Sequence, residues 1–235
     1  MVSSFTNETN TEMTNWNDLE PSIRRVYKNN DKKITIQELD YLKEAYSFTE
    51  NLWLSQIAKI DKVEVVMISE APLFGKNKNY FYNLDTKFSS FFNFNDIIEV
   101  LDIQCEKEDY NNKEFAINAL NKKGFLILDI FPFALNPEIT ELNFKNLKKN
   151  DYQVLFGNNL ETYIEDKLQL IKSKSNEKIV FAYRYKRLRN NVHELLKRKI
   201  IQHGLIQSTE PLEALNNNMS LDRKKLKEII NSNNT

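Results

Sequence analysis

Polar or charged side chains directly follow an apolar run at three places in this sequence. The first is the stretch ISEAPLFG at 68–75, where Glu70 opens a loop that Pro72 stiffens and Gly75 frees. A carboxylate held in fixed geometry after a buried strand can act as a general base or orient a water molecule. Glu70 could equally cap a helix or bond to the backbone of a turn. It is therefore a candidate catalytic residue with a structural alternative.

Asp129 occupies the corresponding position in the stretch LDIFPF at 128–133. An aspartate after a buried strand is either an acceptor that reads a ligand or a residue that forms a turn. Phe131 and Phe133 flank Pro132, and they could form a stacking surface or belong to the core. Asp129 is the second candidate catalytic carboxylate.

The third place is the basic segment FAYRYKRLR at 181–189, where four cations alternate with tyrosines. Arginine and lysine can contact phosphates and tyrosine can stack on bases, which suits single-stranded or extruded nucleic acid. A solvated basic loop explains the same residues equally well. Arg184, Tyr185 and Arg187 are the candidate substrate-binding residues of this segment.

The composition argues against several kinds of site. The chain has 33 basic and 33 acidic residues, so its formal net charge is zero and any nucleic-acid contact must come from a local patch. One cysteine, Cys105, and two histidines argue against a disulfide and against a metal centre with Cys or His ligands. With four glycines, the chain contains neither a P-loop nor a G-x-G-x-x-G motif. We therefore expect neither a metal nor a cofactor.

The distribution of apolar residues bears on the compartment and on the ends of the chain. The N-terminal stretch is polar and lacks the apolar region of a signal peptide, and no apolar run approaches the roughly 20 residues of a membrane span. We expect a cytoplasmic protein without membrane contact. Residues 1–33 show no periodicity and are expected to form a mobile polar arm. The tail, 210–235, is expected to contain a helix around 221–230.

The region between them, 34–209, is expected to be a single α/β domain. It opens with a capping box at Thr35 and Glu38 that predicts a helix running to about Lys59. Short, almost continuously apolar runs then alternate with helical patterns, which is typical of parallel strands covered on both faces. The predicted strands are Val63–Ser69, Phe125–Ile130, Gln153–Phe156 and Ile179–Tyr183. We expect a three-layer α/β/α fold around a short four-stranded parallel sheet.

Ligands of open parallel sheets bind beyond the carboxyl ends of the strands. Glu70, Tyr82, Asp129 and Arg184 all follow closely on predicted strands or lie in the loop after one. We therefore predict that these four residues surround one cleft.

The stretch VMISEAPLFGKNKNYFYN at 66–83 resembles the first active-site motif of the uracil-DNA glycosylase superfamily. By that resemblance, Glu70 matches the motif acid near the catalytic water, and the segment from Tyr80 to Tyr82 would line the base pocket. Phe91 or Phe92 would stack on the extruded base. The stretch GFLILDIFPF at 124–133 resembles the strand that ends in a base-reading residue, where the family usually has Asn and this chain has Asp129.

The resemblance covers roughly residues 62–190 and departs from the family at its last motif. Family members usually carry a histidine-containing loop after the final strand, and this chain reads AYRYKRLR there. Arg184 could supply a positive charge in place of the histidine. The resemblance implies a DNA-repair hydrolase that binds nucleic acid or a nucleobase and cleaves an N-glycosidic bond.

Two alternatives to this activity remain. The first is a non-catalytic protein of the same fold that binds a nucleotide, a nucleic acid or a protein partner in the retained pocket. The second is an interaction module without a small-molecule pocket.

Overall fold

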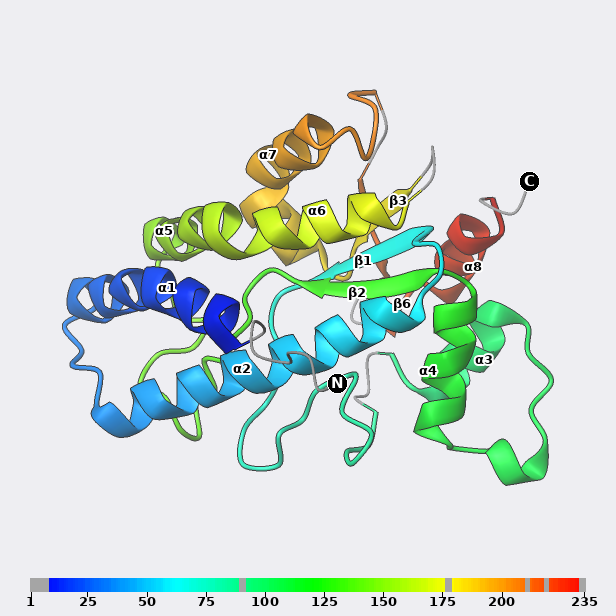
Figure 1. Ribbon diagram of the computed structural model, residues 1–235, viewed down its shortest axis with the longest axis horizontal. Helices are drawn as coiled ribbons and strands as arrows, with labels where there is room; N and C mark the ends of the chain where they lie inside the picture. Colours follow the sequence, from blue (N-terminus) through cyan, green and yellow to red (C-terminus); the bar gives the residue numbers. More distant parts are fainter. Residues whose placement is uncertain (1–8, 89–91, 176–178, 210–211, 218–219, 233–235) are drawn as a thin grey trace, which may run out of the picture.

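The computed structural model describes residues 9–88, 92–175, 179–209, 212–217 and 220–232. Its centre is a four-stranded, all-parallel sheet with the strand order β2–β1–β3–β4 (Figure 1). The strands are β1 (Val65–Ser69), β2 (Phe125–Asp129), β3 (Val180–Tyr183) and β4 (Glu213–Ala214). A two-stranded antiparallel pair is formed by β5 (Asn216–Asn217) and β6 (Ser220–Leu221).

Helices flank the sheet on both faces, so the predicted three-layer α/β/α fold is confirmed. The helical segments are α1 (Thr9–Asn29), α2 (Ile36–Lys59), α3 (Phe94–Leu101), η1 (Lys107–Asp109), α4 (Lys113–Lys122), α5 (Lys149–Asn159), η2 (Leu160–Ile164), α6 (Glu165–Ser173), α7 (Lys186–Gln202) and α8 (Arg223–Ser232). The connections β1–β2 and β2–β3 cross the sheet in opposite directions. Because parallel crossovers are right-handed, their helices cover opposite faces.

The contacts between helices agree with this division. In one group, α4 lies against β2, α3 packs on α4, and α8 packs on α3. These three helices gather at the right of Figure 1, away from α1 and α5. In the other group, a buried ion pair between Glu50 and Lys167 joins α2 to α6, and the Lys167 ammonium lies 4.1 Å from the centroid of the Trp53 ring. The two groups of helices thus enclose β1 and β2, whose residues are all buried.

One of the four predicted strands is wrong. Gln153–Phe156 lies inside α5, whose buried residues include Tyr152, Leu155, Phe156 and Asn159. This spacing of three, four and seven residues is helical, whereas a four-residue apolar run by itself does not distinguish a strand from a helix. The fourth strand is instead the two-residue β4, which is too short to produce a sequence pattern.

The expectation of a mobile arm is wrong for residues 9–29, because they form α1. Trp16, Leu19, Ile23, Val26 and Tyr27 of this helix are buried in the main hydrophobic core. Their spacing follows the helical repeat, but polar residues between them and Pro21 in the helix obscure it. The predicted helix in the tail is confirmed as α8.

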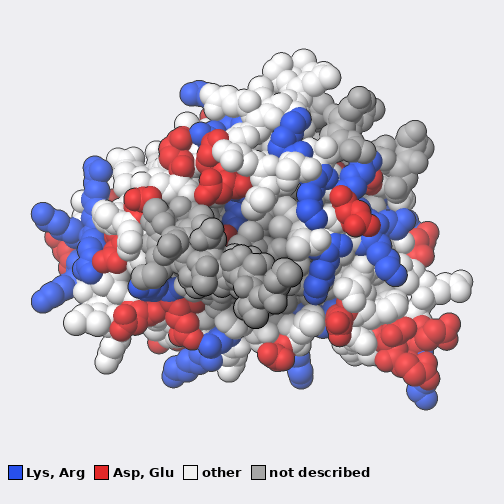
Figure 2. All heavy atoms as spheres, viewed as in Figure 1, with Lys and Arg blue, Asp and Glu red and all other residues white. Residues whose placement is uncertain are grey.

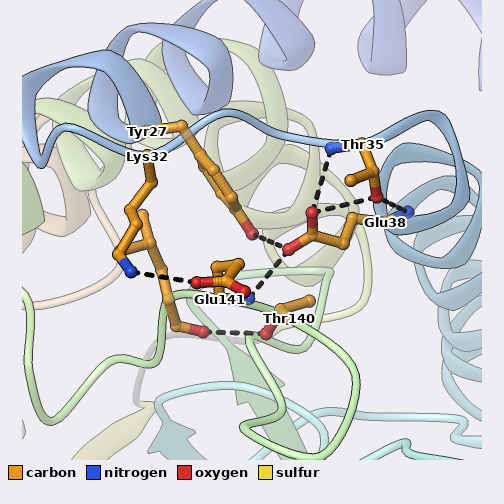
Figure 3. A network of polar contacts seen from close by, with 7 residues as sticks. Tyr27, Lys32, Thr35, Glu38, Thr140 and Glu141 are labelled. Atoms are coloured by element: carbon orange, nitrogen blue, oxygen red, sulfur yellow. Dashed lines mark hydrogen bonds and ion pairs between the residues drawn. The ribbon is translucent and has the colours of Figure 1, made fainter.

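Glu38 is the centre of a buried hydrogen-bond network that joins three segments of the chain (Figure 3). Its Oε2 accepts hydrogen bonds from the backbone N–H and the hydroxyl of Thr35, which completes the predicted capping box. Its Oε1 accepts from the Tyr27 hydroxyl at 3.0 Å and from the Glu141 backbone N–H at 2.8 Å. Burial raises the pKa of Glu38, but hydrogen bonds from Thr35, Glu141 and Tyr27 outweigh burial, and the pKa lies below its usual value.

We expect Glu38→Gln to destabilise the fold by about 1–3 kcal/mol, because an amide group cannot accept all four bonds and leaves buried donors unsatisfied. The free energy of unfolding in urea at pH 7 is the measurement. The matched control is Glu44→Gln on the same helix, since Glu44 makes an exposed ion pair with Lys78 and its loss is worth under about 1 kcal/mol. Equal destabilisation by the two substitutions would contradict the role of the network.

Candidate functional site

The carboxyl ends of β1, β2 and β3 bring three polar side chains together. Ser69 and Asp129 are paired residues at the ends of β1 and β2. The backbone N–H of Arg184 donates to the Ile68 carbonyl at 2.8 Å, which extends the pairing of β3 with β1. The Arg184 guanidinium in turn donates from Nη1 to Ser69 Oγ at 3.3 Å. The strand register therefore fixes an aspartate, a serine and an arginine at one edge.

This edge borders a cavity of about 190 Å³. Polar and charged side chains at its wall come from all three strand ends and from the loop after β1. Aromatic and aliphatic side chains supply the rest of the surface. The lining residues are Ser69, Ala71, Pro72, Leu73, Asn79, Tyr80, Phe81, Lys87, Phe88, Ile127, Asp129 and Arg184.

Asp129 is the buried carboxyl group of the cavity, with 5 % of its surface exposed. Burial raises its pKa to about 6, against the opposing effects of hydrogen bonds from Ser69 and Tyr80 and of the Arg184 charge. Desolvation is thus the largest influence on the pKa of Asp129, even with Arg184 close by. Asp129 consequently changes its protonation state close to neutral pH, where it can accept or exchange a proton.

The loop after β1 is rigid where it borders the cavity. Phe74 and Asn79 exchange two backbone hydrogen bonds, at 2.7 and 2.8 Å. Between them, Gly75 adopts a φ of +67°, and an added Cβ would lie 2.7 Å from Asn136 Nδ2, so the position favours glycine. The Lys113 ammonium holds the following part of the loop by donating to the carbonyls of Tyr80 and Asn83.

Glu70 does not line the cavity, although its neighbours Ser69 and Ala71 do. Its carboxylate accepts two hydrogen bonds from Arg187 Nη2, at 2.8 and 2.6 Å, and one from the Tyr152 hydroxyl at 3.0 Å. Burial and the charge of Glu70 raise the pKa of Tyr152 far above its usual value, so the hydroxyl remains a donor. Glu70 therefore joins the loop after β1 to α5 and α7.

The basic segment makes mainly intramolecular contacts. Arg184 lines the cavity and lies over the Tyr185 ring, with 5.0 Å from the guanidinium carbon to the ring centroid. Arg187 pairs with Glu70, and Arg189 donates from Nε to the Leu212 carbonyl at 3.0 Å. Figure 2 shows that the visible face carries basic and acidic side chains interspersed. Three of the four cations thus have structural contacts, which weakens the case for an extended phosphate-binding surface.

The structure brings together Tyr80, Asp129 and Arg184 of the predicted site residues, with Glu70 and its partner Arg187 beside them. Tyr82 lies in the core instead, where its hydroxyl accepts a hydrogen bond from the Ile127 backbone N–H at 2.7 Å. The predicted single cleft is therefore only partly realised. Phe91, which was predicted as a residue that stacks on the base, lies outside the described residues.

Three aromatic residues considered for stacking on a ligand, Phe92, Phe131 and Phe133, are buried in the core. Phe92 is buried and stacks on Phe81, with 5.7 Å between ring centroids. Phe131 and Phe133 are also buried and pack against Phe144, so they belong to the core rather than to a stacking surface.

Sequence reasoning missed Ser69, Lys87 and Phe88 as cavity residues, whereas Phe81 belongs to the segment predicted to line the pocket. Ser69 carried a usable signal, because it is the last residue of an apolar run and lies beside Glu70. Lys87 and Phe88 carried none, since they belong to an irregular loop whose path depends on Lys113.

Membrane-spanning helices and metal-binding clusters are both absent from the described residues. No helix there is long and apolar enough to cross a membrane. In the same part of the chain, no three His, Cys, Asp or Glu residues are grouped so that they could hold a metal ion. The chain matches no protein-family model, no curated protein and no solved structure.

The raised pKa of Asp129 predicts an unusual dependence of stability on pH. Between 3.8, its ordinary pKa, and about 6, the folded protein holds a proton on Asp129 that the unfolded chain has lost. Stability contributed by this residue is therefore present below pH 3.8 and lost as the pH rises through 6. Two pKa units correspond to about 3 kcal/mol.

We expect Asp129→Asn to stabilise the protein at pH 7 by about 1–3 kcal/mol and to flatten the stability profile between pH 4 and pH 6. Urea unfolding at a series of pH values is the measurement. Asp40→Asn, on the exposed face of α2, is the control. A loss of stability in Asp129→Asn at pH 7 would show that the charged form is favoured by the fold.

Proposed function

We propose that the cavity binds a nucleobase through a ring N–H and the adjacent carbonyl, the edge that uracil, hypoxanthine and xanthine present. The observation that carries this proposal is that Asp129 and Arg184 line the same cavity, with the Arg184 charge acting on the Asp129 carboxyl group. An ionised carboxylate only accepts hydrogen bonds, whereas a guanidinium only donates them. Side by side, they complement an edge that offers one donor and one acceptor.

The size and walls of the cavity support a single planar ring system. Its volume of about 190 Å³ lies below the roughly 300–1,000 Å³ of pockets that enclose drug-sized ligands. Phe81, Phe88 and Tyr80 supply aromatic surface, and aromatic side chains stack on extruded bases in enzymes that act on them. A free base, or one base of a larger molecule, fits these dimensions.

The resemblance of residues 66–83 and 124–133 to the uracil-DNA glycosylase superfamily also supports the proposal. In that interpretation, Asp129 occupies the base-reading position and Tyr80 holds the carboxyl group in place. Glu70, the motif acid, is bound by Arg187 and Tyr152. For Glu70 to orient a catalytic water, the water must therefore reach the carboxylate alongside Arg187 and Tyr152.

Hydrolysis of an N-glycosidic bond is the second candidate function, and the position of Arg184 favours it. A guanidinium beside the base edge would stabilise negative charge on a departing base, as the family's histidine does. Asp129 or Glu70 would act as the general base toward water. A binding protein of the same fold would use the cavity without this step.

We expect uracil or hypoxanthine to bind at pH 7.5, and their N-methylated forms, 3-methyluracil and 1-methylhypoxanthine, to bind at least about tenfold more weakly. Methylation removes the N–H group that would donate a hydrogen bond to the Asp129 carboxylate. Isothermal titration calorimetry is the measurement. Binding should strengthen as the pH rises through about 6, since ionisation makes Asp129 an acceptor, and Asp129→Asn should remove this pH dependence. Equal affinity for both members of each pair would contradict the proposal.

Base release separates the two candidate functions. Duplex and single-stranded oligonucleotides carrying uracil, hypoxanthine or xanthine are incubated with the protein and scored for abasic sites. Abasic sites that disappear in Glu70→Gln and Asp129→Asn support hydrolysis. Base binding without abasic sites supports a non-catalytic binding protein.

A further inference from the structure

A second cavity of about 580 Å³ adjoins the first, and the two share Lys87 and Phe88 in their walls. Phe88 and Lys87 therefore separate the two spaces. The second cavity is about three times as large as the first. A base in the first cavity would leave whatever is attached to it close to this larger space.

The second cavity differs from the first in chemistry. Asn93, Asn95, Asn111 and Thr86 give it a polar wall, and Asp85 adds a carboxylate. Asparagine amides and a carboxylate are suitable partners for sugar hydroxyls, because they offer both acceptors and donors. Asn93 Oδ1 and the Thr86 hydroxyl already make hydrogen bonds within the protein, and the exposed polar side chains of the wall that can accept hydrogen bonds are Asp85, Asn95 and Asn111.

Lys113 adds a positive charge to the wall of this cavity. Its Nζ donates to the carbonyls of Tyr80 and Asn83 and to the Thr86 hydroxyl, at 3.1, 2.7 and 3.2 Å. These acceptors carry no charge, and within the described residues no carboxylate lies within ion-pair distance of the Lys113 ammonium. Burial lowers its pKa to about 8, so most of it is charged at neutral pH. Together with the exposed Lys87, it outnumbers Asp85 among the charged side chains of the cavity wall.

We propose that the second cavity binds the sugar–phosphate of a nucleotide whose base occupies the first cavity. This inference rests on the proposed function for the identity of the base, while the sugar–phosphate site stands on its own lining. The first cavity is too small for a whole nucleotide, and the second supplies hydroxyl partners and cationic charge beside it. The ligand class is thus a nucleoside phosphate, either free or within a nucleic-acid chain.

Ribose 5-phosphate tests the second cavity without a base. We expect it to bind the full chain at low ionic strength and to bind at least about tenfold more weakly to Asn95→Asp, because a negative charge in the wall repels phosphate. Asn95 is the second residue of α3, where an acidic side chain favours the helix, so this substitution leaves the fold intact. Calorimetry measures the binding and thermal unfolding checks the fold.

Gln37→Glu is the matched control, since Gln37 is the second residue of α2 and the change adds the same charge at the same helical position. It should leave ribose 5-phosphate binding unchanged. No binding of ribose 5-phosphate to the wild-type chain, or equal effects of the two substitutions, would overturn the inference.

Uridine 5′-monophosphate and uracil then connect the two cavities. We expect the nucleotide to bind at least about tenfold more tightly than the base, and Asn95→Asp to remove this gain while uracil binding stays unchanged. Binding of uracil without any gain from the sugar–phosphate would overturn this inference and leave the proposed function in place. Binding of ribose 5-phosphate without binding of any base would do the reverse.

Discussion

The in-register pairing of β1 with its two neighbours is the constraint on which the site depends. It places Ser69 beside Asp129 and brings Arg184 next to Ser69, so that three strand ends form one polar edge. Because side chains alternate between the two faces of a sheet, a shift of one residue in the pairing of β1 with β2 would end the alignment of Ser69 with Asp129. Helices cover both faces of the sheet, and every residue of β1 and β2 is buried, so the polar groups at the strand ends are held at the edge of the core.

Burial of Asp129 then sets the chemistry of this edge. The surrounding apolar core withholds water from the carboxyl group, and its partners Ser69, Tyr80 and Arg184 compensate only in part. A group that weakens the folded state when it ionises is a feature expected of a functional site rather than of a stabilising contact. Glu70 shows the opposite situation, because Arg187 and Tyr152 satisfy its carboxylate and fix the loop. Of the two carboxylates at this edge, Asp129 is the one that faces the cavity.

The sequence was sufficient for the features that depend on local patterns. The short, almost continuously apolar runs predicted β1, β2 and β3, and the Thr35–Glu38 capping box predicted the start of α2. Features that depend on tertiary contacts were not predictable in this way. The run at 153–156 became helical because its neighbours at helical spacing face the core, and α1 is held by packing that its polar composition hides. The contacts of Lys113 likewise join segments about 30 residues apart.

The pKa of Asp129, followed through the carboxyl ¹³C resonance with and without uracil, tests the central claim most directly. We expect a pKa of about 6 for Asp129 in the unliganded protein. Bound uracil should lower the pKa of Asp129, since an N–H donor stabilises the ionised carboxylate. A pKa near 3.8 in the unliganded protein, or one that uracil leaves unchanged, would contradict the central claim.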